Sequence, residues 1–435
     1  MSSDNEAMEA EERFQRLYRS LAKGRIAEGR GEAPLSLERP DREQALLDPT
    51  EAQERFGCFI DIFDEPADRK GDAFRIAIKD VFAFDGHRPS AGVPSHRFDF
   101  GLTDSPVIRV LRQAGAQIAG TTHLCPWCYL PHEENPYLPM PTHPLGEDLL
   151  IGGSSSGSAV AVAAGIVDAA LGTDTGGSVR IPAALCGLYG LKPSRDRIST
   201  AGVMPLSQTN DTVGILARSP DLVAQVFDVL RGDRVEDMGF DPAASFAVPD
   251  GAFDSVAPEV VQAGTALSNR LTDLGLSRTA TDALPLDELN GCASVVTGFE
   301  AARLHRESLA RFPEDYKGAS GERLAVALEF TAADYAQALA QRADLFEAVM
   351  ERCFAGADYL VMPVSRHYAL TRTAFYAGWT GGGLDLLSLN RWVNLLGLPS
   401  ISIPVDVAVL PVGIQIVGRP HSDETLIELA RKLAD

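Results

Sequence analysis

Two glycine- and serine-rich turns near the middle of the chain constrain its fold more than any other feature. They occupy residues 152–158 (GGSSSGS) and 172–178 (GTDTGGS), and the run 159–170 between them predicts a buried helix followed by a strand. Glycine permits close backbone approach, so each turn can present backbone N–H groups and a serine hydroxyl at one place. Flexible linkers lack such apolar flanks. The pattern therefore indicates an active site built on serines.

The composition narrows the classes of partner. The 435 residues suit two or three domains or one large α/β domain, and 45% hydrophobic with 23% charged residues is ordinary for a globular protein. The net charge of −21 argues against binding to nucleic acid or to an anionic membrane, because both need basic patches. The N-terminal residues resemble no signal peptide, and no uncharged apolar run approaches the roughly 18 residues of a membrane span. We therefore expect a cytoplasmic protein.

Six cysteines are scattered along the chain and suggest no disulfide framework. Cys125 and Cys128 match the C-x-x-C redox pattern, but no second pair completes a zinc site. We expect these two side chains to pack in the core or to line a pocket, and we expect neither a metal nor a cofactor.

Hydrophobic periodicity outlines the remaining elements. The segment 123–147, with six prolines, reads as a long irregular loop, and the aromatic, glycine-rich stretch 366–389 is a candidate pocket wall. The segment 422–425 (SDET) is expected to cap the last helix. Helices are predicted over 9–27, 105–116, 219–231, 255–274, 294–311, 331–353 and 423–433, and strands over 74–82, 117–122, 359–363, 401–404 and 412–418.

Lys79 stands at the end of an apolar stretch within the predicted strand 74–82. An isolated lysine in this position usually extends its ammonium group to solvent. A buried lysine instead has a lowered pKa and can serve as a base. The strand alone does not decide between the two.

Taken together, these motifs resemble the amidase signature family of serine amidohydrolases. The resemblance covers roughly residues 70–435 and is specific, because several ordered blocks carry it and no single short pattern does. The matching blocks are 77–80 (AIKD), 152–157 (GGSSSG), 172–182 (GTDTGGSVRIP), 186–193 (CGLYGLKP), 394–399 (NLLGLP) and 410–415 (LPVGIQ).

The resemblance implies an α/β fold with a central mixed, twisted β-sheet surrounded by helices. It divides the chain into an N-terminal segment, 1–69, packed on an amidase signature domain, 70–435. A mainly helical region at about 219–390 would form the substrate pocket.

The resemblance also implies a catalytic triad of Lys79, Ser154 and Ser178, with a cis peptide bond between Gly153 and Ser154. Ser178 would attack the amide carbon, Ser154 would bridge, and neutral Lys79 would accept the proton. The substrate would be a small-molecule carboxamide, arylamide or urea- or biuret-type compound, cleaved to an acid and ammonia or an amine. The block 122–127 departs from the family's usual pattern, so substrate preference does not carry over.

The family resemblance also implies roles for residues around the triad. The backbone N–H groups of Thr175, Gly176 and Gly177, with that of Ser178, would form an oxyanion hole. Expected supporting residues are Asp174 and Arg180, which would hold the nucleophile turn, and Ser155, which would support the pair Lys79–Ser154.

Three alternatives stay open at this point. Residues 153–157 satisfy the G-x-S-x-G elbow of α/β-hydrolases, with Ser155 as nucleophile and His305, His367 or His421 as partner. An amidotransferase-type subunit that supplies ammonia within a complex would use the same triad, and a non-catalytic scaffold would not need it. A homodimer or a small partner subunit is compatible with each enzyme interpretation.

Overall fold

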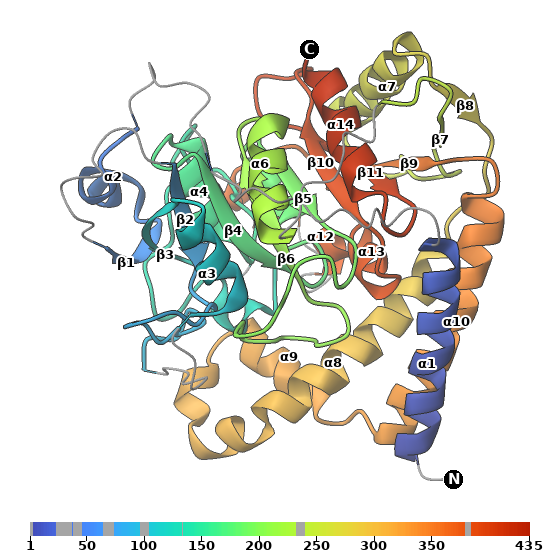
Figure 1. The fold of residues 1–435 in the computed structure, drawn as a ribbon. Coiled ribbons are helices and arrows are strands. Elements are labelled where there is room, and N and C mark those ends of the chain that lie inside the picture. The colour runs from blue at the N-terminus through green and yellow to red at the C-terminus, as the bar shows by residue number, and fades with distance from the viewer. Residues whose placement is uncertain are drawn as a thin grey trace.

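A mixed sheet of eleven strands is the centre of the computed structural model (Figure 1). The structure describes residues 3–22, 37, 46–63, 74–95, 104–132, 134–231, 240–378 and 384–435. Within them the strand order is β1-β3-β2-β4-β6-β5-β10-β11-β9-β7-β8. The strands are β1 (Phe59–Ile62), β2 (Arg75–Lys79), β3 (Gln117–Thr122), β4 (Ala169–Asp174), β5 (Tyr189–Lys192), β6 (Thr212–Ala217), β7 (Ser245–Ala247), β8 (Ser277–Thr279), β9 (Tyr359–Pro363), β10 (Ser400–Pro404) and β11 (Gly413–Gly418).

Parallel and antiparallel ladders combine in this sheet. Strand β2 pairs in parallel with β3 and β4, whereas the strands from β4 to β9 pair antiparallel. Because the carboxyl ends of parallel strands meet at one edge of a sheet, Lys79 at the end of β2 lies beside the turn that follows β4. The predicted mixed α/β sheet is confirmed.

Helices cover both faces of the sheet (Figure 1). Among the described residues, shorter helical turns complete them: the 3₁₀ segments η2 (Pro126–Cys128) and η3 (Pro313–Tyr316), and the π-helical turn η4 (Val349–Cys353). The helices are α1 (Ser3–Ala22), α2 (Pro49–Phe56), α3 (Pro106–Gln113), α4 (Ser156–Ala163), α5 (Arg180–Leu185), α6 (Pro220–Arg231), α7 (Pro258–Asp273), α8 (Leu286–Arg311), α9 (Ala319–Ala327), α10 (Ala332–Ala348), α11 (Arg372–Ala377), α12 (Leu384–Ser388), α13 (Arg391–Leu395) and α14 (Asp423–Ala434).

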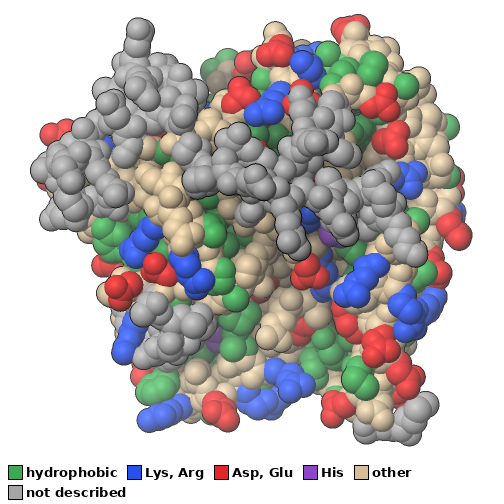
Figure 2. Space-filling view, viewed as in Figure 1, with side chains coloured by type: hydrophobic (Ala, Val, Ile, Leu, Met, Phe, Trp, Pro, Cys, Tyr) green, Lys and Arg blue, Asp and Glu red, His purple; other side chains and the backbone are tan. Residues whose placement is uncertain are grey.

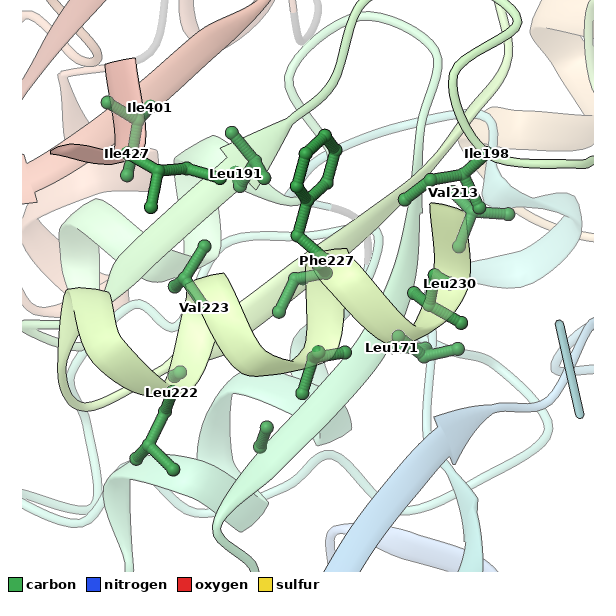
Figure 3. Close-up of a cluster of buried hydrophobic side chains, with 14 of the residues drawn as sticks. Leu171, Leu191, Ile198, Val213, Leu222, Val223, Phe227, Leu230, Ile401 and Ile427 are labelled. Atoms are coloured by element: carbon green, nitrogen blue, oxygen red, sulfur yellow. The ribbon is translucent and has the colours of Figure 1, made fainter. Parts of the chain in front are cut away.

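Helix α6 packs on one face of the sheet through an apolar stripe. Val223 and Phe227 belong to the same buried cluster as Leu171, Leu191 and Val213, which come from β4, β5 and β6 (Figure 3). Helices α3 and α14 pack beside α6, and α7 lies over β9 and β11. Spacing of apolar residues at three and four positions along α6 is what turns one side of the helix toward the sheet.

The opposite face is covered by α4 and α5, the two helices that follow the serine turns. All residues from Ser156 to Val162 in α4 are buried, and they are small or β-branched. A Cβ atom on Gly157 would lie 2.3 Å from the carbonyl oxygen of Cys58 and 2.5 Å from the backbone nitrogen of His123. Glycine is therefore required where α4 begins against the sheet.

A second layer of helices lies beside the sheet and contains α1, α8, α9 and α10 (Figure 1). Helix α1 packs along α10 through Phe14 and Tyr18, within the predicted helix 9–27, whereas Leu21 is 40% exposed. Helix α8 begins at Leu286, eight residues before the predicted start. Asn290 and Gly291 have low helix propensity, so the sequence did not predict a helix there. Leu289 is buried in an apolar cluster, and this packing stabilises the additional helical turns.

The side-chain cap predicted at Ser422 does not form. Its hydroxyl donates a hydrogen bond back to the carbonyl oxygen of Arg419 (2.8 Å) and makes no cap bond to α14. Asp423, the first residue of the helix, accepts from the backbone N–H of Ser194 (2.6 Å). A tertiary contact therefore takes precedence over the local cap at this helix start.

Strand β1 lies within the predicted N-terminal segment 1–69 and forms one edge of the sheet. The division at residue 70 stays a prediction. Among the described residues, no helix is both long and apolar enough to cross a lipid bilayer. Figure 2 shows acidic and basic side chains interspersed over the lower part of one face.

Candidate active site

Lys79, the last residue of β2, is fully buried. Its Nζ donates hydrogen bonds to Ser154 Oγ (2.8 Å) and to Thr173 Oγ1 (2.9 Å). Ser154 lies in the loop before α4, and Thr173 lies near the end of β4. Of the two sequence interpretations, a lysine reaching solvent or a buried lysine, the structure therefore shows the second.

The two serine turns are joined directly. The backbone N–H of Ser155 donates to the carbonyl oxygen of Ser178 (3.2 Å), and the peptide bond between Gly153 and Ser154 is cis, as the family resemblance implied. Ser178 is 5% exposed and lines a pocket. The structure thus brings Lys79, Ser154 and Ser178 to one edge of the sheet.

The turn that carries Ser178 is organised by Asp174. Its carboxylate accepts hydrogen bonds from the backbone N–H groups of Gly177 (2.8 Å) and Val179 (3.1 Å), and from the Arg180 guanidinium at Nε (3.2 Å) and Nη2 (3.0 Å). Gly177 has φ of +122°, and a Cβ there would lie 2.8 Å from Cβ of Asn390. The turn therefore needs glycine at this position.

Asp174 and Arg180 form an ion pair with both side chains fully buried. Burial alone would raise the pKa of Asp174, but the charge and hydrogen bonds of Arg180 hold that pKa well below its usual range. The carboxylate therefore stays ionised at neutral pH. An intact pair of this kind fixes geometry, and removal of one partner leaves a buried charge uncompensated.

Arg180 also reaches residues far along the chain. Its guanidinium donates to Asn394 Oδ1 (2.7 Å), to Gln415 Oε1 (2.8 Å) and to the carbonyl oxygen of Asn390 (3.2 Å). Asn394 Nδ2 in turn donates to the carbonyl oxygen (2.7 Å) and to Oδ1 (2.9 Å) of Asp174. Sequence reasoning assigned no role to these partners, although two of them lie in the blocks 394–399 and 410–415.

The backbone donors of the turn divide into two sets. The N–H of Gly177 is occupied by Asp174, whereas those of Thr175, Gly176 and Ser178 donate to no group in the described part of the chain. The prediction that Gly177 offers its N–H to an oxyanion therefore does not match this geometry. The other three donors fit that role.

Thr175 is anchored from outside the turn by Asp211. Its hydroxyl donates to Asp211 Oδ1 (2.5 Å), and the backbone N–H groups of Leu206 (2.8 Å) and Ser207 (3.0 Å) donate to Asp211 Oδ2. Burial raises the pKa of Asp211 to about 6, against the opposing effect of these hydrogen bonds. This carboxyl group was not singled out in the sequence, because a lone Asp in a turn carries no pattern of its own.

Ser155 does not have the surroundings of a hydrolase nucleophile. Its hydroxyl points to β4 and donates to the carbonyl oxygen of Thr173 (3.4 Å). Within the described residues, Ser155 makes no hydrogen bond to His305, His367 or His421, and His305 instead lies 3.0 Å from a tyrosine hydroxyl. The α/β-hydrolase alternative is therefore wrong. Through Thr173, Ser155 supports the residue that binds Lys79.

The pocket at Ser178 is small, about 30 Å³. Cys128 lies on its wall, as expected for the C-x-x-C segment, and Cys125 Sγ packs under Gly153. Of the predicted wall 366–389, Leu387 contributes, and residues 379–383 lie outside the described part of the chain. The lining residues are Cys128, Tyr129, Thr175, Gly176, Ser178, Leu206, Ser294, Thr297, Arg323, Leu387 and Arg391.

Comparisons with known proteins agree with this geometry. A family model described as Amidase matches residues 75–427. The chain belongs to the amidase family. A solved structure of an amidase shares the fold with a TM-score of 0.77 and 32% identity, covering 83% of this chain and 84% of that one. The resemblance predicted from the sequence blocks is confirmed.

Two curated relatives show how far the similarity extends. Amidase 1 of Arabidopsis thaliana is 40% identical over 185 residues, which is 40% of this chain and 43% of that relative. One subunit of the glutamyl-tRNA(Gln) amidotransferase of Anaeromyxobacter sp. (strain K) is 30% identical over 408 residues, covering 83% of this chain and 82% of that relative. The chain thus matches less than half the length of the first relative and most of the second.

Proposed function

We propose that the chain is an amidohydrolase that cleaves the C–N bond of a small-molecule amide, with Ser178 as nucleophile, Ser154 as bridge and Lys79 as base. One observation carries this proposal. The buried Nζ of Lys79 lies 2.8 Å from Ser154 Oγ, and the residue after Ser154 is hydrogen-bonded to the carbonyl of Ser178. Family membership supports amide hydrolysis as the reaction class.

A serine hydroxyl is a weak nucleophile and needs an adjacent base. Neutral Lys79 takes the Ser154 proton while Ser154 takes that of Ser178, and Ser178 Oγ forms a bond to the amide carbon. The resulting oxyanion accepts hydrogen bonds from the N–H groups of Thr175, Gly176 and Ser178, each worth about 3 kcal/mol.

Collapse of this intermediate breaks the C–N bond, and the relay through Ser154 returns the proton to the departing ammonia or amine. Water then gives a proton to the same relay and attacks the Ser178 ester. The acid leaves, Ser178 regains its proton, and Lys79 is neutral again. Asp174 and Arg180 act as positioning residues, because they fix the turn without reaching the reacting atoms.

The substrate class in this proposal is a carboxamide, an arylamide or a urea-type compound. A second candidate is a subunit that supplies ammonia within an amidotransferase complex, favoured by the long similarity to the amidotransferase relative. Co-purification of partner subunits from the native host would support that candidate. A homodimer stays a prediction.

The proposal is tested by peptide-mapped mass spectrometry after treatment with a serine-directed fluorophosphonate. We expect label on Ser178 in the natural chain and little or none in Lys79→Ala, with Lys317→Ala, an exposed lysine, as the matched control. Label on another serine, or label on Ser178 that does not depend on Lys79, contradicts the relay. Absence of label favours the partner-dependent or non-catalytic alternative.

A further inference from the structure

The loop 205–211 connects the nucleophile turn to helix α8. It reaches Asp211 directly before β6, and continuing the antiparallel register of β4 and β6 puts Asp211 opposite Thr175. The Thr175 hydroxyl donates to Asp211 Oδ1 across this pair (2.5 Å). Leu206, in the same loop, lines the pocket at Ser178. The position of the loop therefore affects where Thr175 lies beside the nucleophile.

Helix α8 binds the other side of this loop through the carboxylate of Glu300. Oε2 accepts hydrogen bonds from the Ser207 hydroxyl (2.6 Å) and the backbone N–H of Thr209 (3.1 Å), and Oε1 accepts from the Thr209 hydroxyl (2.8 Å). The Tyr335 hydroxyl, on α10, also donates to Oε1 (2.6 Å). All four donors are uncharged. Three of these hydrogen bonds attach the loop to the carboxylate.

A cavity of about 400 Å³ lies between the loop and α8. Residues 205, 206, 208 and 209 of the loop line it, together with Glu300 and Tyr335. Close packing positions most buried segments of a protein, but the cavity leaves these loop residues without it on this side. The separation between the loop and α8 is therefore set by hydrogen bonds, three to Glu300 and one from Asn210 Nδ2 to Thr297 Oγ1 (3.1 Å).

Two carboxylates bind the loop from opposite sides, and Ser207 contacts both. Its hydroxyl donates to Glu300, and its backbone N–H donates to Asp211 Oδ2 (3.0 Å) beside that of Leu206 (2.8 Å). Ser207 is fully buried. A displacement of this residue moves the Asp211 carboxylate, to which the Thr175 hydroxyl is bonded. A continuous path of hydrogen bonds thus leads from Glu300 to Thr175.

We propose that Glu300 is a positioning residue that holds the backbone N–H of Thr175 in place for the oxyanion formed at Ser178. A donor stabilises an oxyanion only when it lies about 2.7–3.1 Å from the oxygen in the transition state, so a small displacement of the donor slows the reaction. Glu300 acts through the loop, because it is not among the residues that line the Ser178 pocket. This inference rests on the proposed function, because it assigns a further residue to the same reaction.

The rate of fluorophosphonate labelling at Ser178 tests this role. The phosphoryl oxygen of the probe gains negative charge as Ser178 Oγ attacks phosphorus and fluoride leaves, so labelling uses the same donors. Rates over a range of probe concentrations separate the maximal rate, kinact, from the binding constant, KI. In Glu300→Ala we expect kinact to fall about tenfold or more, with KI unchanged within about twofold. Glu307→Ala, which changes an exposed glutamate of the same helix, should keep both values.

A conservative variant and a double-mutant cycle separate positioning from a general loss of structure. Glu300→Gln keeps an acceptor oxygen for the Thr209 N–H, and the neighbouring hydroxyls can accept from its amide group, so kinact should lie within about threefold of the natural value. Thr175→Val removes the hydroxyl that donates to Asp211. Combined with Glu300→Ala, it should lower kinact little beyond the larger single effect, because both variants interrupt one path.

Three results overturn the positioning role while Ser178 still labels: an effect of Glu300→Ala confined to KI, a Glu300→Gln variant as slow as Glu300→Ala, or effects that multiply in the double variant. If circular dichroism shows that Glu300→Ala does not fold, Thr209→Val replaces it, because it removes one hydrogen bond to the same carboxylate. Its kinact should fall about threefold, and an unchanged value overturns the role. Failure of the natural chain to label at Ser178 overturns the proposed function instead.

Discussion

The nucleophile turn and the arginines of the Ser178 pocket differ in how their charges are balanced. In the turn, Asp174 and Arg180 are fully buried and paired with each other. In the wall, Arg323 and Arg391 have uncharged neighbours in place of a carboxylate. The charges of the turn balance each other, whereas within the described part of the chain neither Arg323 nor Arg391 has a carboxylate at ion-pair distance.

The two regions also differ in the elements that build them. Strand ends and the starts of α4 and α5 carry the serines and the lysine, and a sheet holds its strand ends rigidly through ladders on both sides. Helices α8, α9 and α13 carry four of the other pocket residues, Ser294, Thr297, Arg323 and Arg391. The serine turns are therefore held by the sheet, whereas these pocket residues are held by packing between helices.

The largest effect is expected at the nucleophile. Ser178→Ala removes the group that forms the acyl-enzyme, and kcat/KM on an amide substrate should fall by at least about 10⁴-fold. Ser199→Ala, which changes an exposed serine, should keep the activity of the natural chain. Circular dichroism checks that both variants fold. Activity in Ser178→Ala above about one hundredth of the original would contradict the assignment.

The next effect concerns the stability of the turn. Arg180→Ala leaves the Asp174 carboxylate buried without its counter-ion, which should lower the free energy of unfolding by about 3–5 kcal/mol. Arg352→Ala removes an exposed pair with Asp282, in which the side chains are 67% and 55% exposed. That control should leave the urea midpoint nearly unchanged. Equal midpoints for the two variants would show that the buried pair does not hold the turn.

A smaller, pH-dependent effect is expected at Asp211. Its folded-state pKa of about 6 lies above the ordinary value, so its contribution to stability is complete below about pH 4 and is lost as pH rises through 6. Because the side chain keeps partial contact with solvent, the loss should be about 2 kcal/mol. Asp211→Asn removes this titration.

Urea denaturation between pH 4 and 7 measures this effect. The natural chain should lose about 2 kcal/mol more than Asp211→Asn across that range. Asp273→Asn, an exposed change in α7, should follow the natural chain. A natural chain that gains stability relative to Asp211→Asn as pH rises would reverse the assigned direction.

The smallest effect is expected far from the pocket. The buried hydroxyl of Tyr18 donates to the carbonyl oxygen of Gly397 (2.7 Å). Tyr18→Phe should lower the free energy of unfolding by about 1 kcal/mol and leave kcat/KM unchanged. A Tm measurement together with an amide assay checks both parts, and a loss of activity would show that α1 is coupled to the site.

Much of the site was predictable because its residues stand in local patterns. Glycine-rich turns, an apolar strand ending in Lys79 and the alternation of strand and helix around 159–170 are all visible along the sequence. The structure brings Lys79, Ser154 and Ser178 together, as the family resemblance of the blocks that contain them implied. Strands β3, β9 and β11 also lie where periodicity placed them, within one residue.

The parts of the site that were not predicted depend on contacts between segments distant in the sequence, which hydrophobic periodicity does not encode. Thr173 as a partner of Lys79 follows from the parallel register of β2 and β4. Arg323 and Arg391 line one pocket because α9 and α13 both pack against α8. Gly177 was expected to offer its N–H to a substrate, but Asp174 accepts that hydrogen bond, a choice set by the folded turn.

The hydrogen bonds from Arg180 to residues near the C-terminus also determine when the nucleophile turn can reach its final structure during synthesis. Its partners Asn394 and Gln415 follow it by 214 and 235 residues. A nascent chain therefore contains the lysine and both serines long before the groups that hold Asp174 and Arg180 have left the ribosome, and contacts of such long separation form slowly. Full assembly of the nucleophile turn must await the last strands of the sheet.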